Sequence, residues 1–132
     1  MKSKSETMIV AIGIDLVEIA RIEEVFARQG DRFRARVFTE GEIEYCERRA
    51  SKFASYAARF AAKEAAMKAL GTGWSEGVGW LDVEVASEPS GAPALQLHRR
   101  ALERMRELGG IRAHLSLTHS GNLAIAEVLL EG

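Results

Sequence analysis

The sequence has little of what several common protein classes need. Of its 132 residues, one is cysteine and three are histidine, so an internal disulfide is excluded and a structural zinc site would have too few ligands. No apolar run approaches the roughly 20 residues of a membrane helix. The net charge of −1 is not the basic excess of a nucleic-acid-binding protein. The lone Cys46 indicates a reducing, cytoplasmic setting and a filler role, and any metal would need oxygen ligands.

Length and apolar content predict one folded domain. A chain of 132 residues that is 47% hydrophobic is long and apolar enough to bury a core of its own. Residues 1–7 are polar and lack the apolar stretch of a signal peptide. We therefore expect a flexible N-terminal extension at 1–7 and a single domain at 8–132.

Hydrophobic periodicity predicts an α+β fold with an antiparallel sheet packed on one long helix. The predicted strands are 8–17, 81–85, 94–97, 113–119 and 123–130, and the predicted helices run from about 19 to 30, from about 40, over 52–70 and over 98–108. Thr39 to Glu42 has the form of a capping box. The last strand is apolar on both faces, which suggests that something covers both, another subunit being one candidate.

One acid falls on the core-facing stripe of the long predicted helix. At 100° per residue the stripe is formed by Phe53, Tyr56, Ala57, Phe60 and Met67. Glu64 lies in the middle of this stripe, where a bare carboxylate is costly to desolvate and needs a cation or several donors. Two partners are available. Lys68, one turn later, would form a common i,i+4 pair, and a bound metal is the alternative.

A second acid is out of place in the first predicted strand. Asp15 interrupts an apolar segment, and Gly13 on the same face is expected to leave space beside it. Taken alone, Asp15 is more typical of a cap for the helix that follows. Two acids that are both misplaced by polarity favour one divalent ion between them. Two carboxylates with waters and phosphate oxygens are the usual ligands of Mg²⁺.

Basic residues cluster near the same helix. Arg59 and Lys63 share a face, and taken alone they are more typical of a solvated face than of a site. Lys68 is followed by a Gly-Thr-Gly loop (residues 71–73), which alone is more typical of an ordinary helix end. Together with a metal, these groups would supply the charge neutralisation that a reacting polyphosphate requires.

Two segments resemble the signature blocks of a known family. Residues 12–19 (IGIDLVEI) and 59–73 (RFAAKEAAMKALGTG) are similar to those of the holo-[acyl-carrier-protein] synthases, which are 4′-phosphopantetheinyl transferases. The likeness runs from Met8 almost to the C-terminus. It implies the fold of that family and a Mg²⁺-dependent reaction, in which the 4′-phosphopantetheine arm of coenzyme A moves to a serine of apo acyl carrier protein and adenosine 3′,5′-bisphosphate is released.

The resemblance also implies roles for particular residues. Asp15 and Glu64 would bind the metal, and Glu64 and Lys68 would be catalytic, with the general base left open between Glu64 and a water on the metal. The implied coenzyme A-binding residues are Arg59, Lys68, Gly71, Thr72, Gly73, Pro93, Thr118 and His119. The turn Gly91-Ala92-Pro93 departs from the family's usual Gly-Lys-Pro, so a phosphate contact from that lysine is absent.

The resemblance further implies two macromolecular contacts. Residues 28–36 carry four arginines and one aspartate, and Arg21, Arg32 and Arg36 stand where the family has arginines that dock the acidic carrier protein; without the resemblance they would be solvated surface arginines. The family's active site lies between subunits of a homotrimer. Two other functions stay open at this stage: a non-catalytic module that binds coenzyme A or the carrier protein, and a Mg²⁺-dependent phosphohydrolase.

Overall fold

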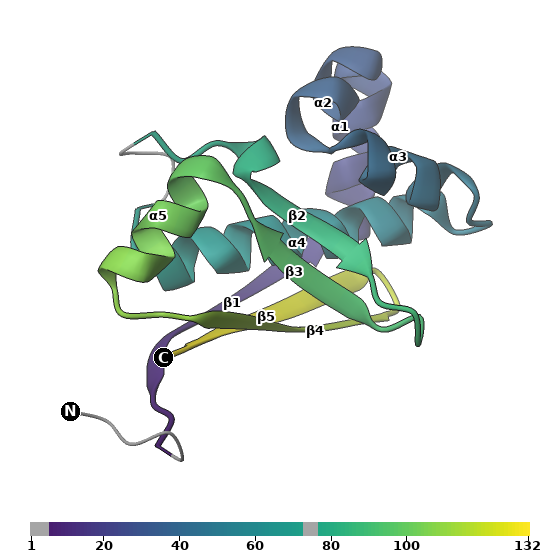
Figure 1. The fold of residues 1–132 in the computed structure, drawn as a ribbon. Helices are drawn as coiled ribbons and strands as arrows, with labels where there is room; N and C mark the ends of the chain where they lie inside the picture. Colours follow the sequence, from purple (N-terminus) through teal and green to yellow (C-terminus); the bar gives the residue numbers. More distant parts are fainter. Residues whose placement is uncertain (1–5, 73–76) are drawn as a thin grey trace.

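The fold is built around one long helix. The computed structural model of the chain describes residues 6–72 and 77–132, so the predicted extension at 1–7 lies mostly outside it. The elements in chain order are β1 (Ile9–Glu18), α1 (Ile19–Gln29), α2 (Asp31–Val37), α3 (Glu40–Glu47), α4 (Lys52–Leu70), a short 3₁₀ turn (Trp80–Asp82), β2 (Val83–Ser87), β3 (Pro93–Leu97), α5 (Arg99–Glu107), β4 (Arg112–Ser120) and β5 (Leu123–Glu131) (Figure 1). None of these helices is long and apolar enough to cross a membrane.

The strands form two antiparallel sheets that both contact α4, and strand β3 of the smaller sheet lies beside β4 of the larger one. The larger sheet has the order β1-β5-β4, and β2 pairs with β3 in a separate hairpin. The helix α4 lies across the three-stranded sheet, with α1 to α3 gathered near its N-terminal end and α5 near its C-terminal end (Figure 1). This arrangement confirms the predicted α+β class with an antiparallel sheet on a long helix.

The contact between β1 and α4 depends on a glycine. A Cβ on Gly13 would lie 1.9 Å from the carbonyl oxygen of Ala65 and 2.8 Å from the amide nitrogen of Ala69, so the helix backbone fills the place of the missing side chain. The expectation that Gly13 leaves space beside Asp15 is therefore wrong. The glycine instead lets the strand approach the helix closely.

The helix α4 is buried on more than the one predicted stripe. Tyr56, Ala57 and Met67 are buried as the helical wheel predicts, and a second set of alanines packs on the sheet. Arg59 and Lys63 are also buried, at 5% and 0% exposure, so the expectation of a solvated face is wrong. Both point into the protein because β2 and α3 cover this side of the helix.

Lys63 is neutralised inside the core. Its Nζ lies 2.8 Å from Oε1 of Glu42 and donates to the carbonyl oxygens of Trp80 and Val83. Glu42 completes the predicted capping box with Thr39 and accepts from the amide of Val85. Every polar atom of this pair therefore has a partner, which is the condition for burying two charges. The pair ties α3, α4 and β2 together.

The helix α2 was not predicted. Gly30, with φ +55°, ends α1 as predicted and also precedes α2. Phe33 and Val37 are buried one turn apart on α2, so tertiary packing rather than intrinsic propensity stabilises these seven residues. The predicted strand at 81–85 likewise begins later, at Val83, because Leu81 belongs to the 3₁₀ turn.

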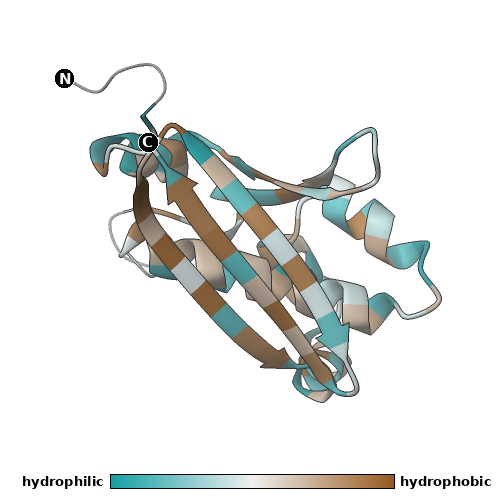
Figure 2. Cartoon of the chain, turned by 90° about the horizontal axis from the view of Figure 1, so that it is seen from below, coloured by the Kyte–Doolittle hydropathy of each residue, from teal (hydrophilic) through white to brown (hydrophobic). Residues whose placement is uncertain are grey.

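The face of the three-stranded sheet that points away from α4 is apolar and exposed in the single chain. Ile12, Ile14 and Leu16 of β1 are each about half exposed, at 55–56%. Ile125 and Leu129 of β5 pair with Leu16 and Ile12 in the register and so lie on the same face. Figure 2 views this outer sheet face, where hydrophobic segments alternate with hydrophilic ones along the strands. The inner face of β5 is fully buried, so only one of its two apolar faces is covered within the chain.

Candidate functional site

The two misplaced acids meet in one cleft. Asp15 comes from β1 and Glu64 from α4, and both line a cleft of about 390 Å³, which we call the acidic cleft. Its other lining residues are Leu16, Val17, Glu18, Arg21, Ile22, Val25, Phe33 and Phe60. Apolar side chains thus form much of the wall, and the carboxylates and one arginine supply the charge.

Glu64 has no compensating partner in the described part of the chain, where none of the hydrogen bonds or ion pairs involves its carboxylate. Burial raises the pKa of Glu64, the negative charge of Asp15 raises it further, and only Lys68 acts in the opposite direction. The cleft therefore holds more negative charge than its own residues neutralise. This is the electrostatic condition that favours a bound cation.

Lys68 pairs with the other acid. Its Nζ lies 2.9 Å from Oδ1 of Asp15 and donates to the carbonyl oxygen of Ile14 at 3.0 Å. The alternative i,i+4 pair between Glu64 and Lys68 is thus not formed. The alternative role of Asp15 as a helix cap is also wrong, because the N-cap of α1 is Glu18. The amide of Ala20 in the first turn donates to Oδ1 of Asn122 instead.

The acidic cleft fits Mg²⁺ better than a transition metal. Residues 6–72 and 77–132 contain no group of three or more histidine, cysteine, aspartate or glutamate side chains that could hold a metal. Mg²⁺ is usually held by one or two carboxylates, with waters and substrate phosphates completing the shell. Asp15 and the uncompensated Glu64 match that donor set.

Four of the predicted coenzyme A residues lie in a second cleft. Arg59, Pro93, Thr118 and His119 line a cleft of about 220 Å³, the hairpin cleft, together with Tyr45, Ser55, Ala58, Ser87, Gly91 and Leu117. It shares no lining residue with the acidic cleft. Within one chain, the structure thus groups Lys68 with the two acids and Arg59 with the β-hairpins.

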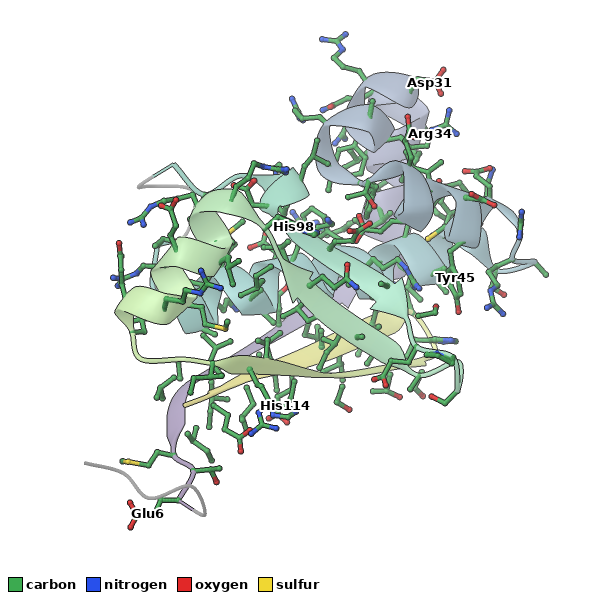
Figure 3. The ribbon with its side chains drawn as sticks, in the orientation of Figure 1. Glu6, Asp31, Arg34, Tyr45, His98 and His114 are labelled. Carbon is green, nitrogen blue, oxygen red and sulfur yellow. The ribbon has the colours of Figure 1, made fainter. Side chains whose placement is uncertain are left out.

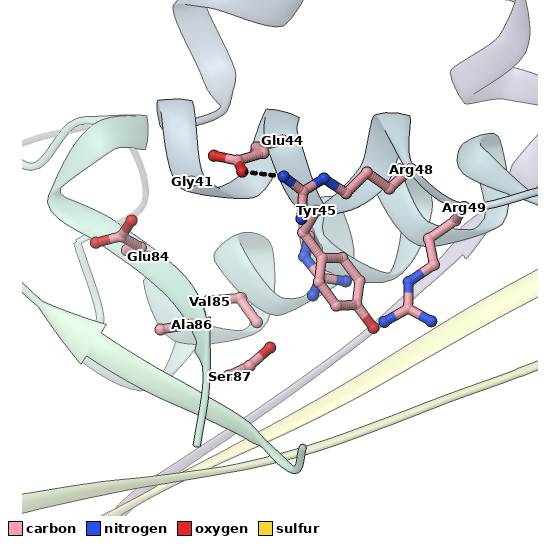
Figure 4. A pocket seen from close by; sticks show the side chains of 10 residues that line it. Gly41, Glu44, Tyr45, Arg48, Arg49, Glu84, Val85, Ala86 and Ser87 are labelled. Carbon is pink, nitrogen blue, oxygen red and sulfur yellow. Dashed lines mark hydrogen bonds and ion pairs between the residues drawn. The ribbon is translucent and has the colours of Figure 1, made fainter. Parts of the chain in front are cut away.

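Next to the hairpin cleft is a larger cavity of about 480 Å³, the arginine cleft. It is lined by Gly41, Glu44, Tyr45, Arg48, Arg49, Arg59, Glu84, Val85, Ala86 and Ser87 (Figure 4). Tyr45, Arg59 and Ser87 line both cavities. The Nε of Arg59 is buried and has no hydrogen-bond partner among the described residues. An unpaired buried donor of a cation is costly, and an anionic ligand would satisfy it.

The predicted loop after α4 is only partly described. Gly71 ends the helix in the left-handed conformation, with φ +72°, as a glycine C-cap. Thr72 is buried, and Gly73 lies outside the described residues. Neither Gly71 nor Thr72 lines one of the three clefts.

The predicted docking arginines lie on the helices beside the acidic cleft. Arg21 of α1 lines the cleft itself, and Arg32 and Arg36 of α2 are exposed. Arg34 differs from them, because it pairs with Asp31 and Glu47; Figure 3 shows Arg34 beside Asp31 on α2.

Sequence reasoning missed several residues of the clefts. Tyr45 and Ser87 belong to no recognisable sequence motif. The sequence spacing of Arg49 and Arg59 does not indicate that both side chains line the same cleft. Cys46, by contrast, is a buried filler as predicted, with 0% exposure, and burial raises the pKa of its thiol to about 12.

Comparisons with known proteins identify the family. Residues 11–126 match the sequence model of the 4′-phosphopantetheinyl transferase superfamily. The holo-[acyl-carrier-protein] synthases of Koribacter versatilis and Solibacter usitatus are 51% and 52% identical to the chain over 94% of its length and 99% of theirs. The crystal structure of the Helicobacter pylori holo-[acyl-carrier-protein] synthase in complex with coenzyme A is 35% identical, with a TM-score of 0.79 over 90% of this chain and 98% of that one. The chain therefore belongs to the holo-[acyl-carrier-protein] synthase family of 4′-phosphopantetheinyl transferases.

Proposed function

We propose that the chain transfers 4′-phosphopantetheine from coenzyme A to a serine of apo acyl carrier protein in a Mg²⁺-dependent reaction that releases adenosine 3′,5′-bisphosphate. The observation that carries this proposal is the convergence of Asp15 and the uncompensated Glu64 in one cleft, in a chain of this family. A module that only binds coenzyme A would have no use for an uncompensated Glu64 beside the pair of Asp15 and Lys68.

In this proposal the acidic cleft is the reaction centre. Asp15 and Glu64 would hold Mg²⁺, which when bound neutralises charge on the pyrophosphate of coenzyme A. Lys68, already within 2.9 Å of Asp15, would donate to the phosphoryl oxygens and stabilise the negative charge that builds on the leaving group. The apolar side chains Phe33 and Phe60 in the wall would limit the access of water to this centre.

The hairpin cleft would bind the nucleotide end of coenzyme A. Arg59 offers a buried donor without a protein partner, and Thr118 and His119 offer exposed donors beside it. We assign Pro93 to the wall of this cleft. Gly71, Thr72 and Gly73 stay predicted contacts of coenzyme A. The amide of Gly71 is already bonded to the carbonyl oxygens of Met67 and Lys68 at the end of α4.

We further propose that the active enzyme is a homotrimer with sites between its subunits. Two observations support this. The outer sheet face leaves Ile12, Ile14 and Leu16 half exposed side by side, and clustered exposed apolar residues of this kind mark interaction surfaces. The acidic and hairpin clefts share no lining residue. Coenzyme A could contact both clefts at once if one subunit contributes the acidic cleft and its neighbour the hairpin cleft.

The acyl carrier protein would dock on α1 and α2. Arg32 and Arg36 are exposed on α2, and Arg21 lies at the acidic cleft, so an acidic partner would be guided towards the reaction centre. Coenzyme A and acyl carrier protein as substrates predict a role in fatty acid biosynthesis and lipid metabolism. A cytoplasmic location stays a prediction as well.

The experiment is a mass measurement. Apo acyl carrier protein is incubated with the protein, coenzyme A and Mg²⁺, and both the carrier and the nucleotide products are analysed. We expect the carrier to gain one phosphopantetheine and adenosine 3′,5′-bisphosphate to appear in equal amount. An unchanged carrier with intact, bound coenzyme A would indicate a binding module, and hydrolysed coenzyme A with an unchanged carrier would indicate a phosphohydrolase.

A further inference from the structure

Tyr45 brings two arginines together where no carboxylate compensates them. The guanidinium carbons of Arg49 and Arg59 lie 4.1 and 3.9 Å from the centroid of the Tyr45 ring. Within the described residues, neither guanidinium forms an ion pair with an acid. Two like charges on one ring are held there by the negative face of the aromatic system. Such an arrangement is stable without a ligand and still attracts an anion.

The surroundings of the ring differ from an ordinary charged surface. Arg48, which lines the same cleft, is paired with Glu44 at 2.6 Å, and Glu84 is engaged by Thr39 and His98. The acids of the arginine cleft are therefore occupied. Figure 4 shows the Tyr45 ring between α3 and β2, with Arg49 beside it and Arg48 directed to Glu44.

Tyr45 lies between the arginine cleft and the cleft that we propose for the nucleotide. Tyr45 and Arg59 line both the arginine cleft and the hairpin cleft. Arg59 is buried, with 5% of the residue exposed, and its Nε lacks a partner among the described residues. An arginine that is fixed before the ligand arrives loses less conformational entropy on binding. The tyrosine ring supplies that fixation.

We propose that Tyr45 is a positioning residue, whose ring orients Arg49 and Arg59 for a phosphate group of the nucleotide substrate. This inference rests on the proposed function, in which Arg59 binds coenzyme A. The hydroxyl group of Tyr45 has no hydrogen-bond partner among the described residues, so the aromatic ring and not the hydroxyl carries the role.

The test separates the ring from the hydroxyl. Binding of adenosine 3′,5′-bisphosphate is measured by calorimetry for the unchanged protein, Tyr45→Phe and Tyr45→Leu, and coenzyme A kinetics are measured with apo acyl carrier protein. We expect Tyr45→Phe to bind like the unchanged protein and Tyr45→Leu to bind about tenfold more weakly, the size of one or two lost cation–π contacts. The KM for coenzyme A should rise by a similar factor with kcat nearly unchanged, because Tyr45 does not line the acidic cleft.

A second pair of variants tests whether contact with the Tyr45 ring matters for binding. These variants change exposed arginines, so the test does not depend on the folding of Tyr45→Leu. Arg49→Gln and Arg48→Gln each remove one positive charge from the arginine cleft, but only Arg49 contacts the ring. We expect Arg49→Gln to weaken bisphosphate binding more than Arg48→Gln does. Equal losses in these two variants, or equal affinities of Tyr45→Leu and the unchanged protein, would overturn the inference.

The remaining outcomes are also decisive. If Tyr45→Phe binds as weakly as Tyr45→Leu, the hydroxyl is a direct ligand and the positioning role is wrong. If the unchanged protein binds no bisphosphate at all, both the proposed function and this inference are wrong. That failure is distinguishable, because it does not depend on any variant of Tyr45.

Discussion

At the residue scale, three charged side chains form the proposed reaction centre: Asp15, Glu64 and Lys68. The sequence alone placed Asp15 and Glu64 in apolar surroundings, since both break a hydrophobic pattern. It could not decide which acid pairs with Lys68, because helical spacing favours Glu64 while only the tertiary contact of β1 with α4 brings Asp15 within 2.9 Å. The pairing leaves Glu64 as the uncompensated acid, and its pKa is raised by burial and by Asp15.

We predict that Glu64→Gln stabilises the fold while it abolishes transfer. The unfolded chain titrates a glutamate near pH 4.3, and the folded pKa of Glu64 lies above its ordinary value. Ionisation of Glu64 therefore lowers the free energy of unfolding. This loss is absent below about pH 4, where Glu64 is protonated in both states, and is complete above the raised pKa. Because Glu64 is partly exposed, the gain at pH 7.5 should be small, about 0.5 kcal/mol after solvent screening. Denaturant unfolding at pH 7.5 and at pH 4 measures it; a variant less stable than the unchanged protein at pH 7.5 would contradict the charge argument.

We predict that Lys68→Met increases the affinity of the free protein for a divalent ion. In the free protein Lys68 occupies Asp15, so a metal must compete with a tethered positive charge. Removing that charge should tighten Mn²⁺ binding about three- to tenfold without coenzyme A, although transfer is lost. Lys52→Met is the matched control, since Lys52 pairs with Glu47 at the other end of α4. Weaker Mn²⁺ binding to Lys68→Met would mean that Lys68 supports the ion site instead of competing for it.

At the element scale, the position of α4 against β1 determines the site. The sequence predicted both elements, because one is a long alanine-rich run without glycine or proline and the other is an apolar β-branched run. It did not predict how closely they pack: a glycine in a strand has several structural roles, and only the fold shows that the carbonyl group of Ala65 occupies the space of its missing side chain. The burial of Arg59 and Lys63 escaped prediction for the same reason, since the elements that cover them are distant in the sequence.

We predict that Gly13→Ala severely destabilises the protein. The added Cβ would meet helix backbone at 1.9 Å, and backbone cannot move aside as a flexible side chain can. We expect a loss of at least about 3 kcal/mol or failure to fold. The control is Gly41→Ala in α3, where the nearest atom to the new Cβ is a side-chain oxygen at 3.5 Å; its stability should stay within about 1 kcal/mol or increase. Unfolding curves that are alike for the two variants would contradict this close packing.

At the scale of the whole molecule, the sequence predicts that both faces of the last strand are covered, and the outer sheet face is the one that the single chain leaves exposed. The apolar final strand predicted a covered surface correctly for its inner face, and the structure of one chain leaves the outer face uncovered. A single sequence does not show whether a second copy of the chain covers this face, as we propose. In the proposed homotrimer, the division of the proposed substrate residues between two clefts would have the same origin, because a site shared between subunits is incomplete in either one.

We predict that Ile14→Glu prevents assembly. Ile14 lies opposite Glu127 in the sheet register and is 56% exposed in the single chain. The variant chain should fold, because the new carboxylate is solvated and the cross-strand repulsion costs only about 1 kcal/mol or less. Light scattering should then report a trimer for the unchanged protein and a monomer without transferase activity for Ile14→Glu. Leu81→Glu, exposed but remote from the outer sheet face, should leave the trimer intact. A monomeric but fully active unchanged protein would contradict the shared site.

The central claim is that Asp15 and Glu64 hold one divalent ion, and a Mn²⁺ titration followed by electron paramagnetic resonance in the presence of coenzyme A tests it most directly. The unchanged protein should bind one Mn²⁺ per chain, and Asp15→Asn and Glu64→Gln should each lose most of that affinity. Glu18→Gln, which removes a carboxylate from the same cleft but not from the proposed pair, should retain it. Undiminished Mn²⁺ binding by both Asp15→Asn and Glu64→Gln would contradict the account.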